Sequence, residues 1–172
     1  MGLLGQGEMG SLIQKHRVQI ANDIQWITGE LETLGNPHNY VNQDGLSFLR
    51  INESHVAPWS FTGLPSSHMP SIIITRERTQ LLVFPDEATQ EQYRPAMKTE
   101  SLVIHLSLAV IRGNVPFLSE AQIHNFLDFW KGIFFPVTDA ELYFLAEGPA
   151  VLPAKASLVY VNRNAIQSYL EG

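Results

Sequence analysis

The chain has 172 residues, of which 45% are hydrophobic and 16% charged, with a formal net charge of −6 and no cysteine. This apolar content is enough for a buried core and excludes a disordered chain. The acidic balance disfavours nucleic acids and anionic membranes, which bind through Lys and Arg. The lack of cysteine excludes disulfides, thiolate catalysis and Cys-based zinc sites.

Residues 1–16 lack the basic and apolar regions of a signal peptide. No apolar run approaches the roughly 20 residues of a membrane-spanning helix. We therefore expect a soluble, cytoplasmic protein without membrane insertion. Its charged fraction lies below the roughly one quarter of an average domain. We therefore also expect self-association or a protein partner to cover part of the surface.

The first predicted strand spans residues 18–29, where apolar side chains alternate: Val18, Ile20, Ile24 and Trp26. A period of two is typical of a half-buried strand. The strand ends in Ile-x-Gly, and Gly29 predicts a bulge or sharp bend where a Cβ would be costly. A second strand follows a turn at Asp44 and contains Phe48.

Residues 54–70 are predicted to form a connection too long for a simple hairpin. This connection carries Trp59, Phe61 and Leu64 among turn-forming residues. Aromatic side chains at a loop tip suit a contact surface for a protein partner. Alternatively, the aromatic side chains fold back as a lid over the end of their own barrel, and both interpretations stay open here.

Next along the chain, Arg76-Glu77-Arg78 separates two apolar segments, which predicts a tight hairpin. Residues 85–95 are polar and flanked by prolines, and Asp86 can cap a short helix. We assign this segment to a linker that ends the first half of the chain.

The same patterns return in the same order in the second half. Three matches are involved: Leu102–Gly113 with Val18–Gly29, Asp139 with Asp44, and Arg163 with Arg76. We therefore predict a mainly β protein with short helices, formed by tandem duplication of a small Sm-like or SH3-like bent barrel. The predicted parts are a first repeat at residues 1–85, a linker at 86–99 and a second repeat at 100–172.

The second half is predicted to contain a helix that the first half lacks. Ser119-Glu-Ala-Gln122 forms a capping box, and Gly132 can end the helix. One helical face would carry Ile123, Phe126, Leu127 and Trp130. We expect this face to be buried and to close the second barrel.

Four motifs lie in order across residues 101–171: Ile111-Arg-Gly113, Phe126-Leu-Asp128, Phe134-Phe-Pro-Val-Thr-Asp-Ala140 and Val161-Asn-Arg-Asn-Ala-Ile166. In these motifs the second half resembles an uncharacterised bacterial family of small β-rich domains. The first half keeps only a faint echo of them. The resemblance implies a fold and no activity, because no known activity goes with the motifs.

Two sets of side chains offer alternative functions. Three loop histidines, His38, His55 and His68, would make a metal-dependent enzyme if they converged on one ion. Arg76, Arg78 and Arg163 would make an anion-binding patch, as an Sm-like nucleotide or nucleic-acid binder requires. The opposing interpretations are unrelated loop histidines and solvated hairpin tips.

No pair or triad with catalytic spacing occurs in the sequence. Asp139 is expected to accept backbone amides in a turn and not to act as an acid. We therefore predict a non-enzymatic binding or assembly module of bacterial origin that acts through protein–protein contacts. We assign no catalytic residue, metal ligand or cofactor, and we place the predicted partner-binding site at Trp59, Phe61 and Leu64.

Overall fold

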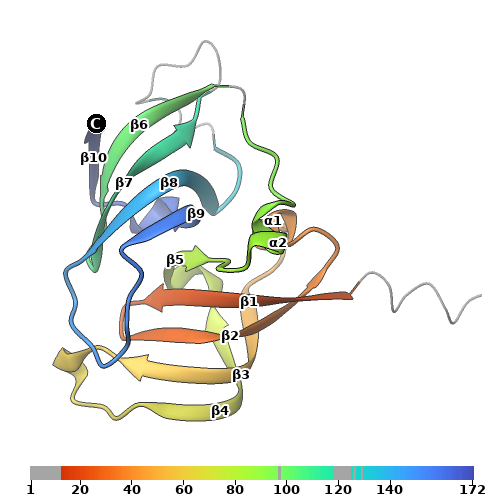
Figure 1. Ribbon diagram of the computed structural model, residues 1–172, viewed down its shortest axis with the longest axis vertical. Helices are drawn as coiled ribbons and strands as arrows, with labels where there is room; N and C mark the ends of the chain where they lie inside the picture. Colours follow the sequence, from red (N-terminus) through yellow and green to blue (C-terminus); the bar gives the residue numbers. More distant parts are fainter. Residues whose placement is uncertain (1–12, 97, 118–124, 126, 129) are drawn as a thin grey trace, which may run out of the picture.

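A computed structural model describes residues 13–96, 98–117, 125, 127–128 and 130–172. It confirms a mainly β fold with short helices (Figure 1). The strands are β1 (Ile13–Asn22), β2 (Gln25–Leu34), β3 (Phe48–Pro58), β4 (Ser67–Thr75), β5 (Thr79–Val83), β6 (Thr99–His105), β7 (Ala109–Pro116), β8 (Phe134–Phe144), β9 (Lys155–Asn162) and β10 (Ser168–Glu171). The helices are α1 (Pro37–Tyr40) and α2 (Glu87–Gln90), with single 3₁₀ turns η2 (Ser60–Thr62), η3 (Arg76–Arg78) and η4 (Arg163–Ala165).

All ten strands belong to one antiparallel sheet in the order β10-β6-β7-β8-β9-β5-β1-β2-β3-β4. Strands β1–β5, here called the first unit, lie in the order β5-β1-β2-β3-β4. Strands β6–β10, the second unit, repeat that order as β10-β6-β7-β8-β9. The units meet where β9 pairs with β5, and we call this pairing the seam. Figure 1 shows β4 and β10 at opposite ends of the molecule.

Each of the two segments predicted as a single strand is a hairpin. The first turns at residues 23–24 between β1 and β2, and the second turns at residues 106–108 between β6 and β7. In the first turn the Asn22 side chain accepts hydrogen bonds from the amides of Ile24 and Gln25. Such a turn reverses the chain within two residues. The apolar alternation therefore continues through the turn, and the sequence pattern does not reveal where one strand ends and the next begins.

Gly29 and Gly113 occupy matching places in the two units. Each lies at a shift in strand register, between β2 and β3 or between β7 and β8. A Cβ added at Gly29 would lie 2.7 Å from the Asn52 carbonyl oxygen, and one at Gly113 would lie 2.9 Å from that of Thr138. The bulge predicted from Ile-x-Gly is confirmed, and close approach of the neighbouring strand explains the glycine.

The predicted match of Asp139 with Asp44 is wrong. Asp139 lies in the bulge opposite Gly113 with a φ of 50°, and its structural counterpart opposite Gly29 is Glu53, with a φ of 45°. Asp44 lies in an exposed turn before β3. The predicted turn role of Asp139 is also wrong, since its carboxylate accepts a hydrogen bond from the Asn114 side chain, 3.4 Å away.

The segments around Arg76 and Arg163 are corners and not hairpin tips. β5 pairs with β1 instead of with β4, and β10 pairs with β6 instead of with β9. The 3₁₀ turns η3 and η4 therefore carry the chain from one edge of each unit to the other. Both turns begin at the arginine, as the sequence match predicts.

The hydrophobic core forms two clusters, and the seam contributes to both. On β5, Leu81 and Val83 point into one cluster and Leu82 into the other. On β9, Val161 and Tyr160 divide in the same way. All five residues of β5 are buried, so solvent is excluded from the β5 side of the seam.

The predicted helix beginning at Ser119 lies mostly outside the described residues, including its predicted face residues Ile123 and Phe126. Of the other two face residues, Leu127 and Trp130 are half-buried and pack against the core cluster of the second unit. Among the described residues, no helix has the length and apolar composition needed to cross a membrane.

Candidate functional site

The predicted contact loop is shorter than expected, because β3 and β4 extend into it and leave only residues 59–66 between them. Trp59 is fully buried, and its indole N–H donates to the Asn22 carbonyl over 2.9 Å. Trp59 is therefore a core residue, and its assignment to a contact surface is wrong. Phe61 and Leu64 are exposed by 68% and 59%.

Burial of Trp59 follows from how the loop is anchored. The Ser60 amide donates to the Glu147 carbonyl in the β8–β9 connection over 2.6 Å. The indole packs near Phe144 of the second unit, with ring centroids 6.4 Å apart. Trp59 thus contacts both units, and it agrees with the lid interpretation only in being buried. Phe61 and Leu64 stay at the surface.

The three predicted anion-binding arginines do not act together. Arg76 is buried, and its guanidinium donates to the carbonyls of Val41 and Gln43 over 3.2 and 2.8 Å. The Arg163 guanidinium donates to the Trp130 carbonyl. Each of these two arginines therefore holds the connection between the second and third strands of its own unit. Of the three, Arg78 is exposed and Arg163 is half-buried.

The three loop histidines of the alternative metal-site hypothesis also do not converge. His55 and His68 face each other across β3 and β4, with ring centroids 4.5 Å apart. His38 belongs to α1 and bonds to Tyr160 and to the Thr89 carbonyl instead. Within the described part of the chain, no three metal-ligating side chains are grouped.

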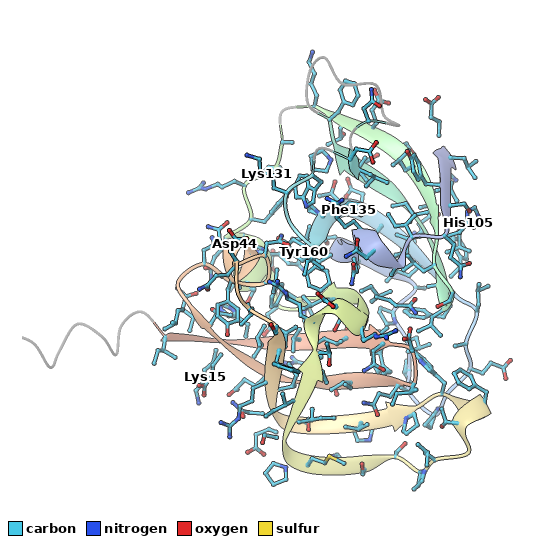
Figure 2. The ribbon with its side chains drawn as sticks, turned by 180° about the vertical axis from the view of Figure 1, so that it is seen from behind. Lys15, Asp44, His105, Lys131, Phe135 and Tyr160 are labelled. Carbon is cyan, nitrogen blue, oxygen red and sulfur yellow. The ribbon has the colours of Figure 1, made fainter. Side chains whose placement is uncertain are left out.

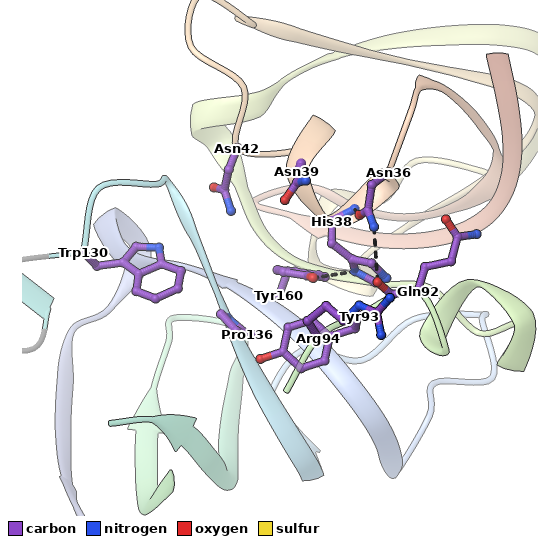
Figure 3. A pocket seen from close by; sticks show the side chains of 10 residues that line it. All are labelled: Asn36, His38, Asn39, Asn42, Gln92, Tyr93, Arg94, Trp130, Pro136 and Tyr160. Carbon is purple, nitrogen blue, oxygen red and sulfur yellow. Dashed lines mark hydrogen bonds between the residues drawn. The ribbon is translucent and has the colours of Figure 1, made fainter. Parts of the chain in front are cut away.

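His38 lies beside a pocket of about 320 Å³ between the α1 segment, the linker after α2 and the second unit (Figure 3). The local sequence positions it: Asn36 caps the His38 amide over 2.8 Å, and Pro37 starts the helix. Tyr160 reaches His38 from β9, and Figure 3 shows the hydrogen bond between them. Figure 2 places Tyr160 near the middle of the molecule.

The hydrogen bonds of His38 fix its protonation. Its Nε2–H donates to the Thr89 carbonyl over 2.8 Å, so Nδ1 carries the lone pair and accepts from the Tyr160 hydroxyl over 2.5 Å. Burial lowers the pKa of His38 and raises the pKa of Tyr160, and both shifts favour the neutral form. The lone pair of His38 is already engaged, and the pair supplies no free general base.

The second buried histidine strengthens this cluster. His16 Nδ1 lies 2.9 Å from the Thr89 hydroxyl, and its ring packs edge-on against Phe84. Its pKa is lowered by burial and then by the nearby His38, against a smaller raising effect of Asp86. The cluster connects the linker to both units, and its role is structural.

Exposed apolar side chains gather near the two ends of the sheet. On the β4 side, Phe48 is exposed by 58%, Ile73 by 67% and Met69 by 39%. On the β10 side, Leu170 is exposed by 52%. In the described structure β4 pairs only with β3, and β10 only with β6. At both ends, exposed apolar side chains therefore lie beside a strand edge that no other described strand pairs with.

These edge residues were missed by sequence reasoning, although one signal was present. Ile72-Ile73-Ile74 is a continuous apolar run, which is typical of a strand covered on both faces. Ile74 is buried, yet Ile73 points to solvent. The described residues therefore cover only one face of this apolar run.

Comparisons of the chain with protein-family models, with curated proteins and with solved structures found no match. No enzyme family and no enzyme relative is therefore detected.

Proposed function

We propose that this chain is a non-enzymatic assembly module that acts by protein–protein contact through the edges of its sheet. The observation that carries the proposal is the uncovered β4 edge with its apolar side chains, Ile73 above all. A strand edge presents unpaired N–H and C=O groups, so it can accept another strand.

Over Ile72–Ile74, the β4 edge lacks the usual protection against strand addition. Proteins protect an edge with Lys, other charges, proline or a bulge, and β4 contains no Lys, Arg, Asp or Glu. Its single proline, Pro70, lies opposite the bulge at Glu53. The segment Ile72–Ile74 beyond it remains open to pairing.

The proposal includes the tandem arrangement predicted from the sequence, with each unit a small, strongly bent Sm-like barrel. Three features support it: the repeated strand order, the bulges opposite Gly29 and Gly113, and the corners that begin at Arg76 and Arg163. In such an arrangement the corners and bulges set the path and register of the strands. We therefore place the functional surface at the edge of each unit.

The test is the size of the protein in an extract of the cells that naturally produce it. We expect the wild type to elute well above its monomer mass of 19.3 kDa, and Ile73→Lys to elute closer to it. Val151→Lys is the matched control, because Val151 is 96% exposed and lies outside the strands. A wild type at monomer size, or an Ile73→Lys variant that elutes unchanged, would contradict the proposal.

A further inference from the structure

The seam shows which two edges of this fold pair with each other. It joins β9, the fourth strand of the second unit, to β5, the fifth strand of the first unit. The two outer edges of the sheet are β4 and β10, which are the fourth strand of the first unit and the fifth strand of the second. The free edges are therefore the same two kinds of edge that the seam already pairs.

Arg76 and Arg163, which begin the two corners, allow the strands of the two units to be matched residue by residue. Counting back from Arg76 and Arg163, Ile72, Ile73 and Ile74 of β4 correspond to Val159, Tyr160 and Val161 of β9. Counting forward, Leu81, Leu82 and Val83 of β5 correspond to Ser168, Tyr169 and Leu170 of β10. The strand pairings agree, because Leu82 lies opposite Ile20 and Tyr169 lies opposite Ile104.

Corresponding residues are buried where a second unit lies beside the strand and exposed where no described unit does. Tyr160 and Phe134 point away from the core of their own unit and lie in the core of the first unit. Their exposed fractions are 2% and 0%. Their counterparts Ile73 and Phe48 are 67% and 58% exposed. Ile72 and Ile74 contact their own core, so Ile73 is the residue left to enter another.

We propose that the chain assembles head to tail with second copies of itself, β4 of one copy pairing antiparallel with β10 of the next. This rests on the proposed function and names its partner. The seam register, in which Leu82 lies opposite Tyr160, transfers to Ile73 opposite Tyr169, with Ile72 opposite Leu170 and Ile74 opposite Ser168. Ile73 enters the core around Ile104 in the neighbouring copy, as Tyr160 enters the core around Ile20.

The contact between copies is weaker than the seam. In the seam the Asn162 side chain donates to the carbonyls of Glu77 and Thr79 over 2.9 and 2.8 Å. The counterpart of Asn162 in β4 is Thr75, which has no side-chain amide to donate. Ser168 stands where the seam has the apolar Leu81. The assembly is therefore reversible and depends on concentration.

The geometry also fixes the kind of symmetry. Because β4 and β10 are different surfaces, each copy keeps one free edge after pairing, and the interface is heterologous. Such contacts continue until the copies close into a ring or extend as an open fibre. A β4–β4 contact would instead stop at a twofold dimer and would leave the β10 edge unpaired.

The absence of cysteine from the chain makes a cross-linking experiment direct. Purified Ile73→Cys and Tyr169→Cys proteins are mixed and oxidised, since a disulfide needs Cα atoms within about 7 Å. We expect a disulfide-linked dimer in the mixture and little in either protein alone. Ile73→Cys mixed with Glu171→Cys is the register control, and it should yield at least about tenfold less dimer because the two positions are two residues out of register.

The mass of the purified wild type gives the second measurement. We expect it to exceed 19.3 kDa and to fall on dilution, with Ile73→Lys monomeric but still folded and Val151→Lys unchanged. A monomer at all concentrations, or dimer in Ile73→Cys alone at the yield of the mixture, would overturn the proposal. If the purified protein is monomeric while the complex in extracts persists, the partner is a different protein and only the self-assembly fails.

Discussion

Strands β9 and β4 hold the same place in the two units but lie in different surroundings. β9 is covered on both faces and paired on both sides, and its outward residue Tyr160 completes the core of the neighbouring unit. β4 is paired on one side within the described structure, and its outward residue Ile73 meets solvent. The comparison teaches that the same strand position is buried where a second unit pairs with it and exposed where no described strand does.

The largest expected effect separates these two residues. Tyr160→Ala should lower the free energy of unfolding by about 3–5 kcal/mol, the usual loss for a buried aromatic side chain. Ile73→Ala should change it by less than about 0.5 kcal/mol in dilute protein, because an exposed side chain loses little on truncation. Urea unfolding measures both. Equal losses would show that the two strands are not in different environments.

The next effect concerns the loop after β3, where one aromatic side chain is covered and its neighbour is not. Trp59→Ala should lower the free energy of unfolding by about 3–5 kcal/mol, since the variant empties a core site and removes a hydrogen bond to Asn22. Phe61→Ala should leave stability within about 0.5 kcal/mol of the wild type. Thermal unfolding of the two single variants makes the comparison, and a stable Trp59→Ala protein would restore the contact interpretation of this residue.

A smaller effect tests whether the two units share one construction. Gly29→Ala and Gly113→Ala should each destabilise the protein by about 1–3 kcal/mol, because each added Cβ would meet a backbone oxygen within 3 Å. Gly148→Ala is the control, since there the added Cβ would find only ordinary contacts with Trp59 and Pro58. A large difference between the first two variants would break the equivalence of the bulges.

The smallest effect is a dependence of stability on pH. Burial lowers the pKa of His38 in the folded protein, whereas the unfolded chain has the ordinary value of 6.5. Below pH 6.5 the unfolded state therefore binds a proton that the folded state resists. The free energy of unfolding then falls as pH decreases and is unaffected above that range. His16 acts in the same direction, because burial and His38 outweigh Asp86 in lowering its pKa.

Urea midpoints at about pH 8 and about pH 5.5 measure this dependence. The His38→Gln variant should show a shallower fall than the wild type. The His68→Gln variant should keep the wild-type fall, because His68 is exposed on β4, away from the cluster of His38 and Tyr160. The explanation fails if His38→Gln follows the wild-type curve.

Local features of the fold were predictable from the sequence because their causes are local. Gly29 and Gly113 lie where a neighbouring strand approaches closely. Arg76 and Arg163 each begin a turn, and their guanidinium groups bind carbonyl groups of the same unit. The match of Asp139 failed because a bulge position tolerates different residues, and the first unit places Glu53 there.

The candidate site was largely unpredictable because it depends on pairing between distant segments. Nothing local marks Trp59 as buried, since its cover comes from the β8–β9 connection. Likewise, the environment of Ile73 depends on the pairing of β9 with β5, which leaves β4 at the end of the sheet. The three histidines and three arginines were separated by the same long-range topology.

Amide hydrogen exchange at two protein concentrations tests the central claim, that the free edges repeat the seam, most directly. Exchange reports opening of individual backbone hydrogen bonds. Concentrating the protein should slow exchange in Ile72–Ile74 of β4 and in Ser168–Leu170 of β10 together, and leave Leu81–Val83 of the seam unchanged. If neither edge gains protection, or if β4 gains it while β10 does not, the free edges do not pair as the seam does.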